Sequence, residues 1–200
     1  MVHALPGMGG DRRMYPEPWT SIHQFVAHDW WPLAGLLSIR EVAESTCARC
    51  AINDGDSVIG SSLGGMVACE IAKLRRLREV YLVGSALHPK EVNSALRWLS
   101  PMIRLTPLRF LQRLARHIPR LLPQMFAAND AQFIRRMSLA VFSWTGAIGV
   151  GTRLIRIHGR RDRIIPKATN VDLWIDGGHL LSISHPDECA RFISANHSVE

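Results

Sequence analysis

Short apolar runs alternate along the chain with longer segments in which apolar residues recur every three or four positions. The first pattern is typical of buried strands and the second of amphipathic helices. The predicted strands are Val2–Leu5, Phe25–Ala27, a run at Val58–Ile59, Val80–Val83, Leu154–Ile157 and Leu173–Ile175. The predicted helices lie near Thr20–Gln24, from Ser38 to the turn at Asn53, from Val67 to about Arg75, and after a cap near Ser184. This alternation predicts an α/β fold whose sheet is mostly parallel, with helices on both faces.

The alternation stops between His88 and Ile148. Prolines at positions 101, 107, 119 and 123 are expected to break a Leu- and Arg-rich helical stretch into short pieces. On the central piece we expect Arg109, Arg113, Arg116 and Arg120 on one side and Leu108, Leu111, Leu114 and Ile118 on the other. Open α/β sheets bind ligands at the carboxyl ends of their strands. We therefore expect residues 88–148 to form a helical cap within a single domain of residues 1–200.

The bulk composition is that of an ordinary soluble domain. Two hundred residues with 47% hydrophobic and 20% charged positions can bury a sizeable core. No apolar run is long enough to span a membrane, and the first residues lack a basic region followed by an apolar signal core. Four scattered cysteines do not suggest a secreted disulfide scaffold. We expect a cytoplasmic protein.

The net charge of +7 is concentrated in the 88–148 segment. Nine basic residues between His88 and Met137 are opposed only by Glu91 and Asp130. No recognisable nucleic-acid motif accompanies them, so we expect no nucleic-acid partner. The simplest interpretation is the solvated face of a helix. Alternatives are attraction of an anionic substrate such as a CoA thioester, or weak contact with an anionic membrane surface.

Two motifs contain residue types that often form functional sites, but a structural role is the better interpretation of each. Cys47 and Cys50 form a CxxC pair on the apolar side of a helix that Ser38 and Glu41 begin with a capping box, so we expect them to be structural. The loop 6–11 is Gly-rich but lacks the spacing of a dinucleotide site, so no cofactor is expected. No Cys/His grouping has the spacing of metal ligands either.

The stretch Gly60-x-Ser62-x-Gly64 lies between a predicted strand and a predicted helix. This is the nucleophile-elbow pattern, in which a serine lies at a sharp strand-to-helix turn. Glycines suit the flanking positions because the turn crowds backbone against strand and helix, and the serine itself is expected to be strained toward positive φ. The helix that follows aims free N–H groups at the serine oxygen.

Two further motifs follow the last two strands. His158-Gly159 leads to Asp162 and Pro166, and Gly177-Gly178 precedes His179. With the glycine-bearing loop after the first strand, four motifs stand in order over nearly the whole chain, and the sequence thereby resembles the α/β-hydrolase superfamily.

The resemblance implies a Ser-Asp-His triad. Ser62 would be the nucleophile, His179 the general base and Asp162 its orienting partner. The backbone N–H groups of Met8 and Leu63 would form the oxyanion hole.

Some nearby residues compete with these assignments. Ser61 does not fit the glycine spacing, and Asp176 fits the strand-end geometry less well than Asp162. For His158 we expect turn packing, and for His185 helix capping.

The sequence departs from the family pattern in three places. It opens directly on the strand that feeds the oxyanion loop, so we expect about six strands. Pro6-Gly7 stands where many members have His-Gly. Only 17 positions separate Asp162 from His179, so the usual connecting helix is expected to be missing.

The function implied is that of a serine hydrolase cleaving carboxylic esters, with medium-chain or lipophilic acyl groups favoured by the single-Gly oxyanion loop and the Leu-rich cap. Thioesterase, lactonase, amidase, acyltransferase and C–C hydrolase chemistry stay open, because one fold supports them all. A non-catalytic module that binds a small ligand is a further alternative, and a membrane-surface scaffold is another. The oligomeric state is left open.

Overall fold

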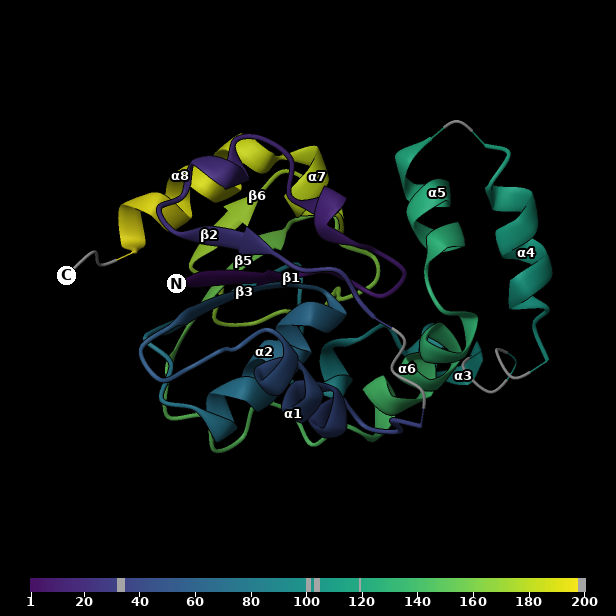
Figure 1. The fold of residues 1–200 in the computed structure, drawn as a ribbon, viewed down its shortest axis with the longest axis horizontal. Coiled ribbons are helices and arrows are strands. Elements are labelled where there is room, and N and C mark those ends of the chain that lie inside the picture. The colour runs from purple at the N-terminus through teal and green to yellow at the C-terminus, as the bar shows by residue number, and fades with distance from the viewer. Residues whose placement is uncertain (32–34, 100–101, 103–104, 119, 198–200) are drawn as a thin grey trace.

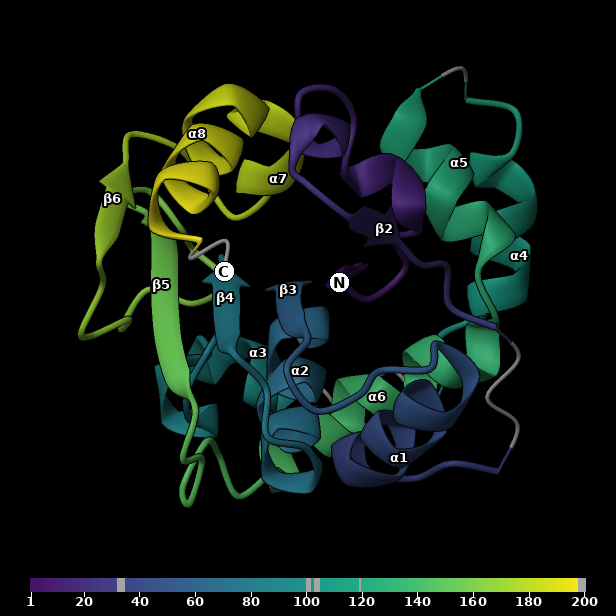
Figure 2. The same cartoon turned by 60° about the vertical axis from the view of Figure 1, so that its left-hand side comes forward.

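A six-stranded parallel sheet forms the centre of the molecule. The computed structural model describes residues 1–31, 35–99, 102, 105–118 and 120–197. The strands lie in the order β2-β1-β3-β4-β5-β6, and every neighbouring pair is parallel (Figure 2). Their bounds are β1 Val2–Leu5, β2 Phe25–Ala27, β3 Ser57–Ser61, β4 Glu79–Val83, β5 Arg153–Gly159 and β6 Leu173–Ile175. The sequence-based prediction of about six parallel strands is confirmed.

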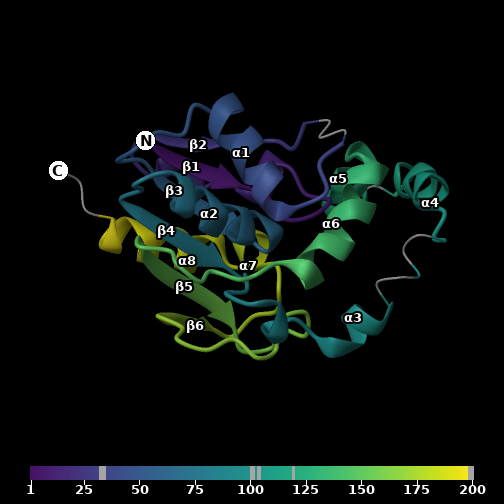
Figure 3. The same ribbon diagram turned by 90° about the horizontal axis from the view of Figure 1, so that it is seen from below.

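Helices cover both faces of this sheet (Figures 1 and 3). Helices α1 (Ile39–Arg49) and α2 (Leu63–Leu74) pack on one face, and α7 (Leu181–Ser184) and α8 (Pro186–Asn196) cover the other. Successive side chains of a strand point to opposite faces of the sheet. Val58 therefore packs in the core beneath α1 and α2, and Ile59 packs in the core beneath α7 and α8. Burial on both faces is why the strands appear in the sequence as continuous apolar runs.

The segment between β4 and β5, which we call the insertion, contributes four α-helices in its described part, beyond the carboxyl ends of the strands (Figure 3). They are α3 (Ser94–Leu99), α4 (Leu108–Ala115), α5 (Leu121–Ala128) and α6 (Ala131–Ser143). Helix α6 packs back onto the main body through Phe133 and Met137, which are buried in the core layer shared with α1 and α2. Helices α4 and α5 lie against each other at the side of the molecule (Figure 1).

One expectation for the insertion was wrong. Pro123 does not break a helix; it lies in the first turn of α5, where a backbone N–H needs no helical partner. On α4, Leu111 and Leu114 are exposed whereas Gln112 is buried. Gln112 donates to the carbonyl groups of Phe126 and Asn129, which ties α4 to the end of α5. Pro107 is the N-cap of α4, and positions 101 and 119 lie outside the described residues.

The remaining predictions concern helix ends. The capping box of α1 is confirmed, since the Ser38 hydroxyl accepts from the Glu41 N–H and the Glu41 carboxylate from the Ser38 N–H. The predicted helix near Thr20–Gln24 is only a 3-10 turn at Trp19–Ser21. Helix α8 begins after His185 rather than Ser184, and the His185 side chain makes no capping bond.

The structure agrees with the predictions for the cysteines and for the short connection between β5 and β6. Cys47 is buried on α1, Cys50 is half-buried, and both are free thiols. Between β5 and β6 the chain is described throughout, and it forms turns without a helix. The expected omission of that connecting helix is confirmed.

A buried ion pair joins the start of the insertion to the sheet. The Arg156 guanidinium on β5 is almost inaccessible, and it donates to the Glu91 carboxylate at 2.7 and 3.2 Å. It also donates to the Ser85 carbonyl at 2.8 Å. Glu91 in turn accepts from the Leu87 N–H at 3.0 Å. These bonds fix the loop after β4, where the insertion leaves the sheet.

Replacing Glu91 tests this anchor. Glu91→Ala is expected to lower the free energy of unfolding by about 3–5 kcal/mol, because it leaves a buried arginine charge without its partner. The control is Glu44→Ala, which breaks an exposed ion pair with Arg40 and is expected to cost less than about 1 kcal/mol. Urea denaturation of both variants measures the difference. Equal losses for the two variants would contradict the anchoring role.

Candidate active site

Ser62 lies at a strained turn between β3 and α2. Its φ of 51° and ψ of −115° are unusual for a residue with a side chain, and it is the N-cap of α2. The flanking glycines are required by close approach of the backbone. A Cβ on Gly60 would lie 2.3 Å from the Gly65 nitrogen, and one on Gly64 would lie 2.3 Å from the Leu5 carbonyl oxygen. The elbow geometry expected from the sequence is therefore present.

The two adjacent serines have different surroundings. Ser61 is buried, its hydroxyl oxygen lies 3.0 Å from the Tyr15 phenol oxygen, and its N–H donates to that phenol oxygen at 3.1 Å. Ser62 is only half-buried and faces a cavity. Burial raises the pKa of Tyr15, whose hydroxyl also donates to the Leu5 carbonyl. Ser61 is thus held inside the fold, and Ser62 is the serine that a ligand can reach.

His179 bridges Ser62 and Asp162. It follows β6 directly in the loop before α7. Its Nε2 lies 2.9 Å from the Ser62 Oγ, and its Nδ1 lies 2.8 Å from Oδ2 of Asp162. The three side chains come from separate strand ends, and the sheet brings them into one hydrogen-bonded chain. This is the arrangement expected from the sequence motifs.

Asp162 is enclosed and fully engaged. Its side chain has no exposed surface. One oxygen accepts from the N–H groups of Ile164 at 2.8 Å and Ile165 at 2.9 Å, while the other faces His179. Burial acts to raise the pKa of Asp162, but hydrogen bonds from His158, His179 and the backbone outweigh it and hold the pKa well below its usual range. Asp162 is therefore a carboxylate that can only accept hydrogen bonds.

Asp176, the competing acid, is placed quite differently. Its side chain is 79% exposed and pairs with Arg161. It makes no contact with His179 among the interactions of the described residues. The choice of Asp162 as the partner of His179 therefore matches the geometry.

His158 lies closer to the site than the sequence suggested. Its ring is buried, and its Nε2 is 2.9 Å from the Ile165 carbonyl oxygen and 3.2 Å from the second Asp162 oxygen. The ring edge packs on Trp174. A neutral ring with its proton on Nε2 can donate to both acceptors. Turn packing was expected for His158, and contact with Asp162 is an additional role that its position in the His-Gly-x-x-Asp motif could have indicated.

Met8 and Leu63, the two expected oxyanion donors, line the same cavity as Ser62. Leu63 is the first residue of α2, and N–H groups in a first helical turn have no acceptor in their own helix. Met8 lies in a tight turn closed by a bond from the Gly10 N–H to the Gly7 carbonyl, which leaves the Met8 N–H outside that bond. The arrangement suits binding of an oxyanion next to Ser62.

Ser85 supports the elbow from the neighbouring strand end. Its hydroxyl donates to the Ser62 carbonyl at 2.6 Å. The sequence offered no signal for this contact, nor for the bond between Tyr15 and Ser61, because both depend on how separate strand ends pack together. The His185 ring accepts from or donates to the Ser184 hydroxyl at 2.8 Å.

The cavity beside Ser62 has a volume of about 470 Å³. Its walls come from the loop after β1, from α2, from the turn after β5 and from the insertion. The described lining residues are Met8, Ser62, Leu63, Met66, Val92, Leu96, Met102, Thr106, Ser138, Val141, Phe142, Ile164 and Ile165. None of these residues carries a charge, and ten of the thirteen are apolar. The cavity therefore suits an apolar ligand group placed against the Ser62 hydroxyl.

The described residues also bear on two other kinds of site. No cluster of three or more His, Cys, Asp or Glu side chains there is arranged to hold a metal ion. No helix in the described chain has the length and apolar character that crossing a bilayer requires. The cytoplasmic location stays a prediction.

Several solved structures share this fold. An esterase from Thermogutta terrifontis is 17% identical, with a TM-score of 0.71 over 97% of this chain and 88% of that chain. An enol-lactonase from Burkholderia xenovorans is 14% identical, with a TM-score of 0.74 over 98% and 91%. A hydrolase from Oleispira antarctica is 14% identical, with a TM-score of 0.72 over 98% and 91%.

At these identities the structural likeness shows the fold alone. No curated protein matches the chain. Residues 2–192, however, match the model of the alpha/beta hydrolase family. The match spans the sheet, the elbow and all three residues of the Ser62–His179–Asp162 chain. The protein belongs to the alpha/beta hydrolase family.

Proposed function

We propose that the protein is a serine hydrolase that cleaves carboxylic esters through an acyl-enzyme. The observation that carries the proposal is the continuous hydrogen-bonded chain from Ser62 through His179 to Asp162, which ends at an apolar cavity. A serine hydroxyl is a weak nucleophile until a neighbouring base removes its proton. His179 Nε2 is within the 2.6–3.2 Å that proton transfer requires.

The proposed reaction has two halves. The Ser62 Oγ attacks the ester carbonyl carbon while its proton passes to His179 Nε2. The tetrahedral intermediate then collapses, the bond to the alcohol oxygen breaks, and His179 returns the proton to the leaving alcohol. Water, deprotonated by the same histidine, attacks the acyl-serine and releases the acid. Ser62 recovers its proton at the end of the cycle.

Charge develops at two places during this reaction. The carbonyl oxygen becomes an oxyanion, for which the N–H groups of Leu63 and Met8 are the proposed donors, and each such donor is worth about 3–4 kcal/mol in related enzymes. The imidazole of His179 becomes a cation, for which the ionised Asp162 is the proposed counter-charge. Because Asp162 only accepts hydrogen bonds, it keeps the proton of His179 on Nδ1 and leaves Nε2 free to act as a base.

The cavity supports a lipophilic acyl group as the substrate. Its volume lies within the range of about 300–1,000 Å³ that is usual for small-molecule sites. The described lining carries no charge, which disfavours a carboxylate or phosphate beside it, because such a group would lose its hydration without a partner there. The insertion supplies the outer wall through Leu96 and Thr106, so we propose that it acts as a cap that sets acyl preference.

Replacing each serine in turn tests the nucleophile. Ser62→Ala is expected to abolish labelling by a fluorophosphonate probe and to lower kcat/KM on p-nitrophenyl butyrate by roughly 10³- to 10⁶-fold. The matched control is Ser61→Ala, which removes only the buried bond to Tyr15 and should still label. Gel fluorescence and steady-state kinetics provide the measurements. Labelling that survives Ser62→Ala would refute the assignment.

The lowered pKa of Asp162 predicts how the stability of the fold depends on pH. A carboxyl whose pKa is lowered in the folded protein stabilises the fold above its unfolded pKa, and this contribution is lost as the pH falls toward the folded value. Wild type should therefore exceed Asp162→Asn in free energy of unfolding by a constant margin from pH 7 to pH 5. The margin should shrink between about pH 4 and pH 3.

Urea denaturation at several pH values measures this margin. Asp176→Asn is the control, because that side chain is 79% exposed and its replacement should change the unfolding free energy little at any pH. A margin for Asp162→Asn that stays the same from pH 7 to pH 3 would show that ionisation of Asp162 contributes nothing to folding.

A larger side chain at Leu96 tests the cavity as the acyl site. Leu96→Trp is expected to lower kcat/KM for p-nitrophenyl esters of long acyl chains, at least tenfold for C10 and C12, because the larger side chain occupies part of the cavity. Hydrolysis of the acetate ester should stay within about twofold of wild type, because the triad is unchanged. Leu37→Trp makes the same change at a site that is 66% exposed and outside the cavity lining. An unchanged chain-length profile in Leu96→Trp would place the acyl group elsewhere.

If no ester is turned over by the labelled wild type, a thioester, a lactone or a non-catalytic ligand becomes the better proposal.

A further inference from the structure

The insertion exposes an unusual number of large apolar side chains. Of the fourteen large apolar residues that are exposed in the described chain, nine lie between positions 98 and 122. They are Trp98, Met102, Leu105, Phe110, Leu111, Leu114, Ile118, Leu121 and Leu122. Trp98 and Leu105 are 84% and 88% exposed. We call this group the outer insertion surface. Scattered exposed apolar residues are normal, but a concentration of this kind marks an interaction site.

Helix α4 shows how this surface is organised. At about 100° per residue, its side chains fall on three separate stripes. The stripes are Leu108, Gln112 and Ala115 (buried), Phe110, Leu111 and Leu114 (exposed and apolar), and Arg109, Arg113 and Arg116 (exposed and basic). The buried stripe faces α5 and α6, with which α4 makes its contacts. Apolar and basic stripes therefore lie next to each other on the free side of the helix.

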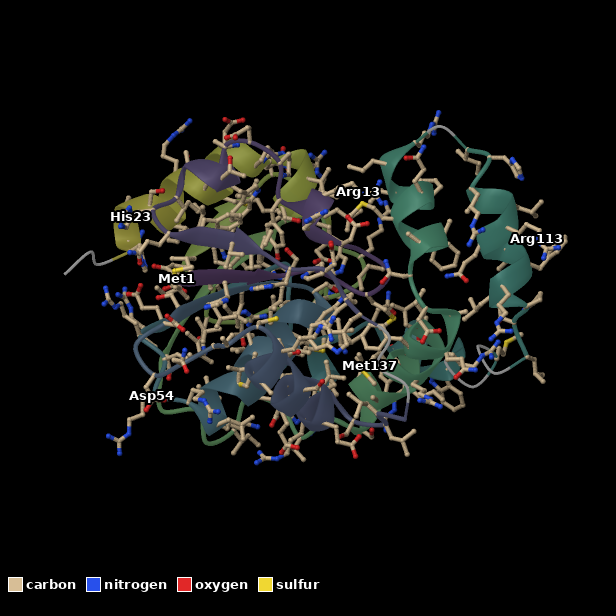
Figure 4. The ribbon with its side chains drawn as sticks, in the orientation of Figure 1. Met1, Arg13, His23, Asp54, Arg113 and Met137 are labelled. Carbon is tan, nitrogen blue, oxygen red and sulfur yellow. The ribbon has the colours of Figure 1, made fainter. Side chains whose placement is uncertain are left out.

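The charge of this segment is entirely positive. Six arginines and no acidic residues lie between Glu91 and Asp130. They are Arg97, Arg104, Arg109, Arg113, Arg116 and Arg120. Figure 4 shows Arg113 on the outer side of α4, at the edge of the molecule farthest from the sheet. Because the segment contributes only positive charge, the partner of this surface should be anionic.

The outer insertion surface also borders the cavity beside Ser62. Met102 is 61% exposed and lines the cavity, and Thr106 lines it as well. Leu105, between them, points almost entirely to solvent. Met102 therefore belongs both to this surface and to the wall of the cavity.

We propose that the outer insertion surface docks on an anionic phospholipid bilayer. A helix with an apolar stripe beside an arginine stripe lies in the plane of the interface, with its apolar side chains among the upper acyl chains and its arginines at the headgroups. An exposed tryptophan such as Trp98 is typical of that boundary. Nucleic acid would account for the arginines but would leave the apolar stripe in water. Delivery of a lipophilic ester from the bilayer to Ser62 is the consequence, and this part alone rests on the proposed function.

Vesicle sedimentation tests the docking. The purified full chain is mixed with vesicles of phosphatidylcholine, or of phosphatidylcholine containing about a third phosphatidylserine, and the bound fraction is measured. Wild type should bind the anionic vesicles and not the neutral ones, and added salt should weaken binding because it screens the charges. Each arginine near such a surface contributes roughly fivefold, so the triple variant Arg109→Gln/Arg113→Gln/Arg116→Gln should bind on the order of 100-fold more weakly.

Three further variants separate charge, apolar contact and catalysis. The matched control is Arg75→Gln/Arg76→Gln/Arg191→Gln, which removes three exposed arginines of the main body and should bind as wild type. Leu111→Ser/Leu114→Ser should weaken binding at least tenfold with the arginines intact. Ser62→Ala should bind vesicles as wild type, so that vesicle binding and ester hydrolysis succeed or fail independently.

The proposal is overturned by any of three results. The first is equal binding of neutral and anionic vesicles, or of neither. The second is an arginine triple variant that binds as well as the control triple. The third is a wild type that elutes as a dimer and ignores vesicles, or binds duplex DNA and ignores vesicles, because another occupant would then cover the surface. Hydrolysis of soluble p-nitrophenyl butyrate should be unchanged in both arginine variants, which shows that each is folded.

Discussion

The close contact between the start of α2 and the end of β1 is the constraint on which the site depends. Gly64 lies so near the Leu5 carbonyl that no side chain fits between them. This approach brings the first turn of α2 next to the loop that carries Met8. It also forces the chain through the strained turn at Ser62, since β3 must join a helix that lies almost against its neighbour strand. The strain is the cost of presenting one hydroxyl at the sheet edge while the adjacent Ser61 stays inside.

The short connection between β5 and β6 does not pull the site apart, because hydrogen bonds replace the missing helix. The turn that holds Asp162 is closed on its own carboxylate by the N–H groups of Ile164 and Ile165. Arg156 reaches from β5 to the Thr169 carbonyl and the Ser85 carbonyl, and so ties this connection to the loop after β4. A buried, satisfied carboxylate and a buried guanidinium thus supply the rigidity that helix packing gives elsewhere. The Arg161 N–H donates to the Gly177 carbonyl at 2.9 Å, and this bond joins the turn of Asp162 to the loop that carries His179.

Sequence patterns were most informative where structure is decided by neighbours in the chain. The elbow around Ser62, the cap of α1 and the parallel strands follow from local spacing and burial, and all were predicted. The spacing could not show that Leu111 and Leu114 face solvent, because that depends on α4 packing through the narrower stripe that contains Gln112. Nor could it show that Tyr15 binds Ser61, or that His158 contacts Asp162, since these partners meet only when separate strand ends come together. These contacts join residues that are far apart in the sequence, and a local motif cannot predict them.

The same insertion that completes the cavity also accounts for the apolar surface. Helix α6 is anchored in the core through Phe133 and Met137, and α5 through Met125, whereas α4 buries only Leu108, Gln112 and Ala115. Helix α4 would gain stability from burying Leu111 and Leu114 as well, yet these side chains are exposed and have arginine neighbours along the helix. Selection for stability alone would favour polar residues at such positions. Exposed apolar residues beside a row of arginines on α4, in an insertion that borders a cavity whose described lining carries no charge, are best explained by contact with a surface that is both apolar and anionic.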